Sequence, residues 1–195
     1  MKNKKFNTYT ITACGILGAV STVLMFMSFS VPFMPSFIKL DFSELPALLA
    51  AFSYGPMAGV AVCAIKNLIN VFATTTGGVG ELSNFLLGCM FVVPAGLVYR
   101  KFKSKKGAFA GALIGAVIMA VVSVFSNYYI IYPVYTVFMP MEVIISMYSA
   151  ILHVDNLWQA LLIFNMPFTF MKGMLNLLLA MWIYKPLSPI LKNRR

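Results

Sequence analysis

The polar side chains best suited to chemistry lie inside stretches that are otherwise apolar. Asn165, Lys172 and Asn176 follow one another at spacings of seven and four residues, so one face of a helix can carry all three. Pro167 cannot donate a backbone hydrogen bond, so that helix is expected to bend. A lysine at such a place needs a partner or water. The group predicts a site for a polar ligand; the alternative is an asparagine that only bridges two helices.

Further polar side chains are expected at the ends of two other helices. Asn127 closes one apolar run, and Tyr128 follows it. Glu81 and Asn84 open another run, just after the glycine-rich residues 77–80. Those glycines lack the lysine and hydroxyl that a nucleotide-binding loop needs. Glu81 therefore has two interpretations: its charge stabilises the start of a helix, or it belongs to a site with Asn84.

Two more polar groups interrupt the apolar sequence. Residues 39–46 place Asp41 and Glu44 between long hydrophobic spans, where hydrocarbon cannot solvate a carboxylate. Lys66 and Asn67, with Asn70 one helical turn further on, form a patch that either lines a site or reaches towards water. Polar breaks of this kind indicate a membrane protein with a binding function rather than a plain anchor.

The composition is that of a membrane protein. Of 195 residues, 61% are hydrophobic and 10% are charged, whereas soluble domains carry about 25% charged residues. The net charge of +10 comes mainly from clusters at the start, at residues 100–106 and at the end, which flank apolar runs as cytoplasmic loops do. We therefore expect membrane lipid and no nucleic acid as a partner. No metal-ligand or catalytic motif is present, so neither a metal site nor an enzyme is expected.

Five apolar segments define the expected fold, and they cover residues 9–30, 42–75, 82–99, 107–127 and 157–184. The second is too long for one crossing, which needs about 20 residues, and Gly55-Pro56 is expected to divide it into two helices. Because the start and residues 100–106 are both basic, an even number of crossings must separate them. The predicted fold class is an all-α membrane protein, a six-transmembrane-helix bundle with both termini cytoplasmic.

This topology makes residues 1–195 a single transmembrane domain. Residues 1–8 are the expected cytoplasmic start, and residues 186–195 are the expected cytoplasmic tail. Residues 31–42 form an outer loop, and residues 128–156 form a longer outer loop with an amphipathic segment that predicts an interfacial helix. Most acidic residues lie at or beside this outer face, so any ligand site is expected to open there.

Small residues recur four apart in two of the apolar segments. Gly15 and Ala19 form one such ridge, and Gly107, Gly111 and Gly115 form another. Small residues at this spacing let helix backbones approach closely. Packing within the bundle is one interpretation, and a docking face for another membrane protein is the other.

The motifs resemble a known family, the substrate-binding (S) subunits of energy-coupling factor (ECF) vitamin transporters. KLDFSELPAL at residues 39–48, FSYGPMAG at 52–59 and KNL at 66–68 resemble motifs that several vitamin specificities share. GELSNFL at residues 80–86, with NMPF and MKG between residues 165 and 173, resembles the riboflavin-specific branch of Gram-positive bacteria. The resemblance covers most of residues 10–185.

The resemblance implies a function and a set of partners. It implies a six-helix bundle in the bacterial plasma membrane that captures riboflavin at the outer face, with residues 31–42 as a lid. Riboflavin is then the transported ligand, and no cofactor is expected. The implied partners are a transmembrane coupling protein and two ATP-binding-cassette (ABC) ATPases. Gly15 and Ala19 match the family's docking pattern of two alanines four apart, with glycine in the first position.

The chemistry of riboflavin suits the residues that the sequence offers. Its ring edge alternates hydrogen-bond acceptors and donors, which an asparagine amide can match, and aromatic side chains can stack on the ring. We expect these ligand-binding residues: Asn127, Asn165, Lys172, Glu81, Asn84, Phe85, Leu40, Asp41 and Tyr128.

Three other functions remain open at this point. The first is an S subunit for another vitamin, such as thiamin. The second is a stand-alone secondary carrier or channel, although the two similar halves typical of such carriers are not evident. The third is a membrane enzyme, which the absence of a catalytic set disfavours. The absorption spectrum of the purified protein would distinguish a flavin from other ligands.

Overall fold

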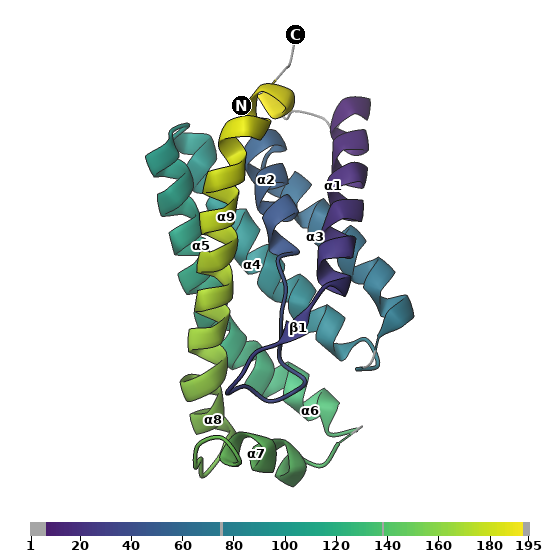
Figure 1. The fold of residues 1–195 in the computed structure, drawn as a ribbon, viewed down its shortest axis with the longest axis vertical. Helices are drawn as coiled ribbons and strands as arrows, with labels where there is room; N and C mark the ends of the chain where they lie inside the picture. Colours follow the sequence, from purple (N-terminus) through teal and green to yellow (C-terminus); the bar gives the residue numbers. More distant parts are fainter. Residues whose placement is uncertain (1–6, 75, 138, 193–195) are drawn as a thin grey trace.

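The computed structural model describes residues 7–192, except residues 75 and 138. The predicted cytoplasmic start is therefore described only from residue 7, and the last three residues of the predicted tail lie outside the described part. The described chain is a bundle of helices with one short strand pair (Figure 1). The first turn of α1 and the last turns of α9 lie at one end of the bundle, and α7 lies at the opposite end.

Among the residues that the structure describes, five helical segments are long and apolar enough to cross a membrane. They are α1 (Thr8–Phe26), α3 (Pro56–Asn70) with the 3-10 turn Val71–Ala73, α4 (Val79–Lys101), α5 (Lys105–Ser126) with its extension to Tyr135, and α8 (Leu157–Ala160) continuing into α9 (Met166–Lys192). The remaining elements are β1 (Phe29–Ser30), β2 (Lys39–Leu40), α2 (Glu44–Tyr54), α6 (Tyr132–Tyr135) and α7 (Met141–Ser149). The prediction of an all-helical membrane protein is confirmed at this level.

The long second apolar segment forms two helices, as the sequence predicted. α2 ends at Tyr54 and α3 begins at Pro56. Gly55 joins them with a φ of 105°, a value that side chains with a Cβ rarely adopt. Pro56 then begins α3, where a missing N–H leaves no intrahelical bond unmade.

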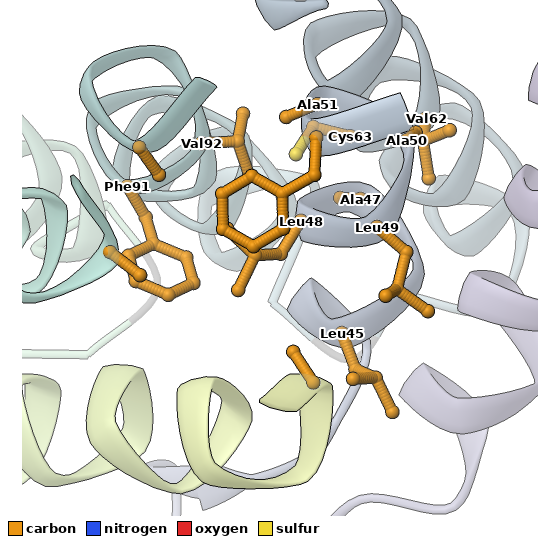
Figure 2. Close-up of a cluster of buried hydrophobic side chains, with 14 of the residues drawn as sticks. Leu45, Ala47, Leu48, Leu49, Ala50, Ala51, Val62, Cys63, Phe91 and Val92 are labelled. Carbon is orange, nitrogen blue, oxygen red and sulfur yellow. The ribbon is translucent and has the colours of Figure 1, made fainter. Parts of the chain in front are cut away.

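The core of the bundle surrounds α2. Ala47, Leu48 and Ala50 of this helix are completely buried, and they lie against α3 and α4 (Figure 2). Phe91 of α4 and Cys63 of α3 are equally buried in the same cluster. The alanines keep α2 narrow, so the neighbouring helices can close around it. The cysteine is a packing residue, as the sequence indicated.

The glycine ridge of α5 packs within the bundle. A Cβ added to Gly111 would lie 2.7 Å from the carbonyl oxygen of Ala95 in α4, and one added to Gly115 would lie 2.3 Å from that of Phe91. These glycines are therefore required for the contact between α4 and α5. The ridge on α1 differs, because Gly15 and Ala19 are exposed and nothing lies within 4 Å of the Cβ position of Gly15.

Two helix boundaries differ from the sequence prediction. The helix that was expected to end at Asn127 continues through a π-helical turn (Asn127–Ile131) and α6, so the following loop starts after Tyr135 rather than at residue 128. Pro133 lies in the first turn of α6, directly after the π-helical turn. The last helix continues to Lys192, past the expected start of the tail. Two short antiparallel strands, β1 and β2, interrupt the otherwise helical fold.

Candidate ligand-binding site

A cavity of about 760 Å³ lies between the segment that joins α1 to α2 and helices α3, α4, α5 and α9. This volume is within the range of sites for small molecules and cofactors. Both apolar and polar side chains line it, among them Met25, Phe37, Asp41, Glu44, Asn70, Thr76, Glu81, Asn84, Met119, Asn127, Tyr132, Tyr135, Ile144, Asn165, Phe168 and Lys172.

At one wall of the cavity, four charged side chains form a charge ring that consists of Asp41, Glu44, Lys66 and Lys172. The Nζ atom of Lys172 lies 2.9 Å from Oδ2 of Asp41 and 3.4 Å from Oε2 of Glu44. Lys66 lies 2.7 Å from Oε1 of Glu44 and also donates to the hydroxyl of Ser43, which in turn donates to Asp41. Two lysines thus balance two carboxylates. Such pairing is required because removing one charge from a buried set leaves another uncompensated.

The charge ring explains the structural roles of Lys66 and Asp41. Lys66 is completely buried, so it does not reach towards water, which was one of its two predicted roles. Asp41 is also buried, and it forms an ion pair with Lys172 and accepts a hydrogen bond from the hydroxyl of Ser43. Asp41 thereby ties the segment before α2 to α9.

Two of the asparagines that line the cavity, Asn127 and Asn165, lie in π-helical turns. Asn127 begins the turn Asn127–Ile131, and Asn165 ends the turn Leu161–Asn165. A proline follows each turn two residues later, at Pro133 and Pro167. Wide turns of this type are frequent at functional sites because they redirect side chains. The predicted irregularity near Pro167 is present, and it places the Asn165 amide at the cavity wall.

Asn165 belongs to a buried hydrogen-bond triangle. The hydroxyl of Tyr148 donates to its Oδ1 atom at 2.6 Å, and its Nδ2 atom lies 3.4 Å from the hydroxyl of Tyr132. The two tyrosine hydroxyls also bond to each other. The ring of Phe37 packs edge-on against Tyr132 and Tyr148, with ring centres 6.3 and 5.9 Å away. The segment between α1 and α2 is thus held at this wall by an aromatic contact.

Glu81 lies both at the start of a helix and at the cavity wall. It lies in the first turn of α4, and its carboxylate also lines the cavity. It accepts hydrogen bonds from Asn70 at 3.0 Å, from the hydroxyl of Thr74 at 2.8 Å and from that of Thr76 at 3.2 Å. Sequence reasoning did not single out the two threonines, although the threonine run before the glycines offered a signal.

The structure brings together six of the nine predicted site residues. Asn127, Asn165, Lys172, Glu81, Asn84 and Asp41 line the cavity. The other three are placed differently. Leu40 is buried in β2, Phe85 packs partly buried against the core, and the ring of Tyr128 contacts Tyr129 and Trp158.

Sequence reasoning missed several lining residues. Phe37, Tyr132, Met119 and Phe168 are apolar or aromatic residues at positions that face the cavity. Their types are equally common on surfaces that face lipid, so composition offered no signal for them.

Comparison with known proteins identifies the family. Residues 9–184 match the family described as the substrate-specific component of ECF transporters. The chain therefore belongs to the S components of ECF transporters. A solved structure of an S component of a bacterial ECF transporter has 30% sequence identity and a TM-score of 0.75, and the match covers 95% of this chain and 98% of that one. The S component described here is a multi-pass cell-membrane protein, as the resemblance implied.

Two relatives of this S component are similar over their whole length. The riboflavin transporter RibU of Staphylococcus aureus is 32% identical over 191 residues, which cover 98% of this chain and 96% of the relative. The riboflavin transporter FmnP of Bacillus subtilis is 32% identical over 198 residues, which cover all of this chain and 97% of the relative.

Proposed function

We propose that this S component captures riboflavin in the cavity beneath the segment that joins α1 to α2. The observation that carries the proposal is the cavity itself, whose wall combines Asn127, Asn165 and Lys172 with aromatic side chains. Full-length similarity to two riboflavin transporters supports the same ligand. A transporter component needs no catalytic group, and the family is not a family of enzymes.

The two sides of the cavity suit the two parts of riboflavin. Phe37, Tyr132 and Phe168 offer apolar surface for the flat ring, and Asn165 stands beside them. Glu81 and Asn84 lie on α4, where carboxylate and amide groups can bond the hydroxyls of the ribityl chain. The Lys172 ammonium donates hydrogen bonds only, so it binds a ligand atom that accepts them.

The topology that we propose has six crossings with both termini cytoplasmic. α2 completes the sixth, although its 11 residues are too few to span the hydrocarbon alone. Asp41 and Ser43, which precede α2, are buried inside the bundle, so this segment extends the crossing. Non-helical backbone is tolerated at such depth only where protein or a cavity surrounds it, and here it borders the charge ring.

The proposed partners provide the energy for uptake. A transmembrane coupling protein would dock against the exposed face of α1 at Gly15 and Ala19, and two ABC ATPases would drive transport. The sequence contains no phosphate-binding loop of its own. The S component alone should therefore bind the vitamin without concentrating it.

Titration of the purified protein tests the proposed ligand. Riboflavin fluorescence should be quenched with a stoichiometry of one riboflavin per chain. A large excess of thiamin should not restore the fluorescence. Binding of thiamin with no quenching of riboflavin would instead support the other vitamin specificity. Accumulation of riboflavin in vesicles that contain only this chain would support a stand-alone carrier.

A further inference from the structure

The strongest unexplained feature is a buried tyrosine beside the cavity. Tyr148 lies in α7, is completely buried and does not line the cavity. Its hydroxyl is 2.6 Å from Oδ1 of Asn165, and that distance fits a strong hydrogen bond between neutral groups. α7 caps the end of the bundle, so this contact connects the cap to the cavity wall.

The proton positions in this triangle follow from the number of donors. Tyr148 has a single hydroxyl proton, which it donates to Asn165 because an amide oxygen can only accept. In the bond between the two tyrosines, the donor must therefore be Tyr132. The hydroxyl oxygen of Tyr132 then accepts from Nδ2 of Asn165. All three bonds run in one direction around the triangle.

The amide of Asn165 is consequently fixed with its nitrogen towards the cavity side. Asn165 and Tyr132 both line the cavity, whereas Tyr148 stands behind them. One N–H of the amide faces Tyr132 at the long distance of 3.4 Å, and the described residues provide no partner for the other. An amide held in this way presents a donor to whatever enters the cavity.

We propose that Tyr148 is a positioning residue that sets the polarity of Asn165, so that this asparagine donates a hydrogen bond to an acceptor on the flavin ring. The proposal rests on the proposed function and specifies the ligand atom: a ring carbonyl oxygen or an unprotonated ring nitrogen, and not the imide N–H. The aromatic side chains around Asn165 place the ring, rather than the ribityl chain, at this wall.

The environment of Tyr148 keeps it in the donating form. Burial, and then the neighbouring Tyr132, raises the pKa of Tyr148 well above the usual value for a phenol. Its proton is thus retained at any pH at which the protein is studied. Without this hydroxyl, the Asn165 oxygen would be buried and unpaired, and the amide would lose its preferred orientation.

A double-mutant cycle provides the test. Riboflavin affinity is measured by fluorescence quenching for the wild type, Tyr148→Phe, Asn165→Ala and the double variant. Tyr148→Phe should weaken binding roughly five- to twentyfold, and it should change affinity less than twofold when Asn165 is already alanine. An unchanged affinity in Tyr148→Phe would overturn the proposal. So would an equal loss in both backgrounds, because that is the behaviour of a purely structural residue.

A second variant does not depend on the folding of Tyr148→Phe. Asn165→Asp replaces the amide donor that faces the ligand by a carboxylate, which at pH 8 can only accept. At this pH, riboflavin should bind to Asn165→Asp at least fivefold more weakly than to Asn165→Ala. Binding equal to or tighter than that of Asn165→Ala would overturn the proposal. Tyr129→Phe is the matched control, because this exposed tyrosine should leave the affinity unchanged.

Failure of this proposal and failure of the proposed function give different results. If the wild-type protein does not quench riboflavin fluorescence at all, the proposed ligand is wrong. If the wild type binds riboflavin and only the variants behave contrary to expectation, the ligand stands and the role of Tyr148 is refuted.

Discussion

At the scale of single residues, the cavity wall carries buried polar side chains that have few alternative hydrogen-bond partners. Asn127, Asn165 and Lys172 reach its wall from two different regions of the chain. Asn127 is 7% exposed and Asn165 is 6% exposed, so water cannot easily replace a lost partner. If these groups bind the proposed ligand, removing one of them leaves a ligand atom unpaired in a buried site.

We predict that Asn127→Ala, Asn165→Ala and Lys172→Ala each weaken riboflavin binding by roughly tenfold to a few hundredfold, on the order of 1.4–3 kcal/mol. Fluorescence titration of the purified variants measures the effect. Lys103→Ala, which removes an exposed lysine far from the cavity in sequence, is the control. Unchanged affinity in all three variants would show that these residues only hold helices together.

The charge ring leads to a prediction about stability. Lys66→Met should destabilise the ligand-free protein by roughly 3–5 kcal/mol, because it leaves Glu44 with Lys172 as its remaining cationic partner in a buried site. Adding Glu44→Gln should restore most of the loss, since both members of the pair are then neutral. Thermal unfolding in detergent compares the two variants. A double variant as unstable as Lys66→Met would show that the pairing is not the cause.

At the scale of elements, close approach of helices determines where small residues are needed. The contact between α4 and α5 is tight enough that backbone atoms of α4 occupy the space of a Cβ on Gly111 and Gly115. The face of α1 around Gly15 has open space instead. Two similar ridges in the sequence therefore have different structural roles.

We predict that Gly115→Ala lowers stability by about 1–3 kcal/mol, because a backbone carbonyl cannot move aside as a flexible side chain can. Gly15→Ala is the matched control in α1, and its effect should stay within about 1 kcal/mol. Melting temperatures of the two purified variants test this difference. Equal destabilisation would mean that the α4–α5 contact adjusts more easily than its geometry indicates.

The exposed ridge of α1 leads to a separate prediction about transport. Ala19→Leu should block riboflavin uptake in cells that contain the coupling protein and ATPases, because the bulkier side chain keeps the docking helix away. Binding by the purified variant should be unchanged, since Ala19 is exposed and does not line the cavity. Lost binding together with an intact complex would contradict the assignment of this face.

At the scale of the whole molecule, the polar groups of the site and the basic clusters lie in different parts of the fold. The cavity lies beneath the segment between α1 and α2, whereas the basic cluster at residues 100–106 spans the end of α4, the short connection and the start of α5. The start of α1 and the end of α9 share one end of the bundle, and α7 lies at the other. In the proposed orientation with cytoplasmic termini, the site opens away from the cytoplasm.

Labelling of single cysteines tests the proposed orientation. In a variant without Cys14, Cys63 and Cys89, a cysteine at His153 should react with an impermeant maleimide on intact cells. A cysteine at Lys103 should react only after the membrane is permeabilised. Labelling of position 103 on intact cells would refute the six-crossing topology with cytoplasmic termini.

Local signals in the sequence were enough to predict the helices and their main break. The thickness of the bilayer sets the length of an apolar span, and Gly55-Pro56 carries its own conformational preference, so neither depends on distant contacts. The same holds for the family motifs, which are read directly from the chain. Polar residues at the cavity wall, such as Asn165 and Lys172, were recognisable because such groups are costly inside a membrane.

Only the tertiary structure decided how these groups are paired. Asp41 meets Lys172 across 131 residues of sequence, and Glu44 meets Lys66 across 22. The orientation of the Asn165 amide depends on Tyr148, which comes from a different helix. A π-helical turn is also invisible to composition, because it changes the hydrogen-bond register rather than the residue types. Such contacts form only when the helices pack, so the sequence determined which residues are present and the packing determined which atoms they meet.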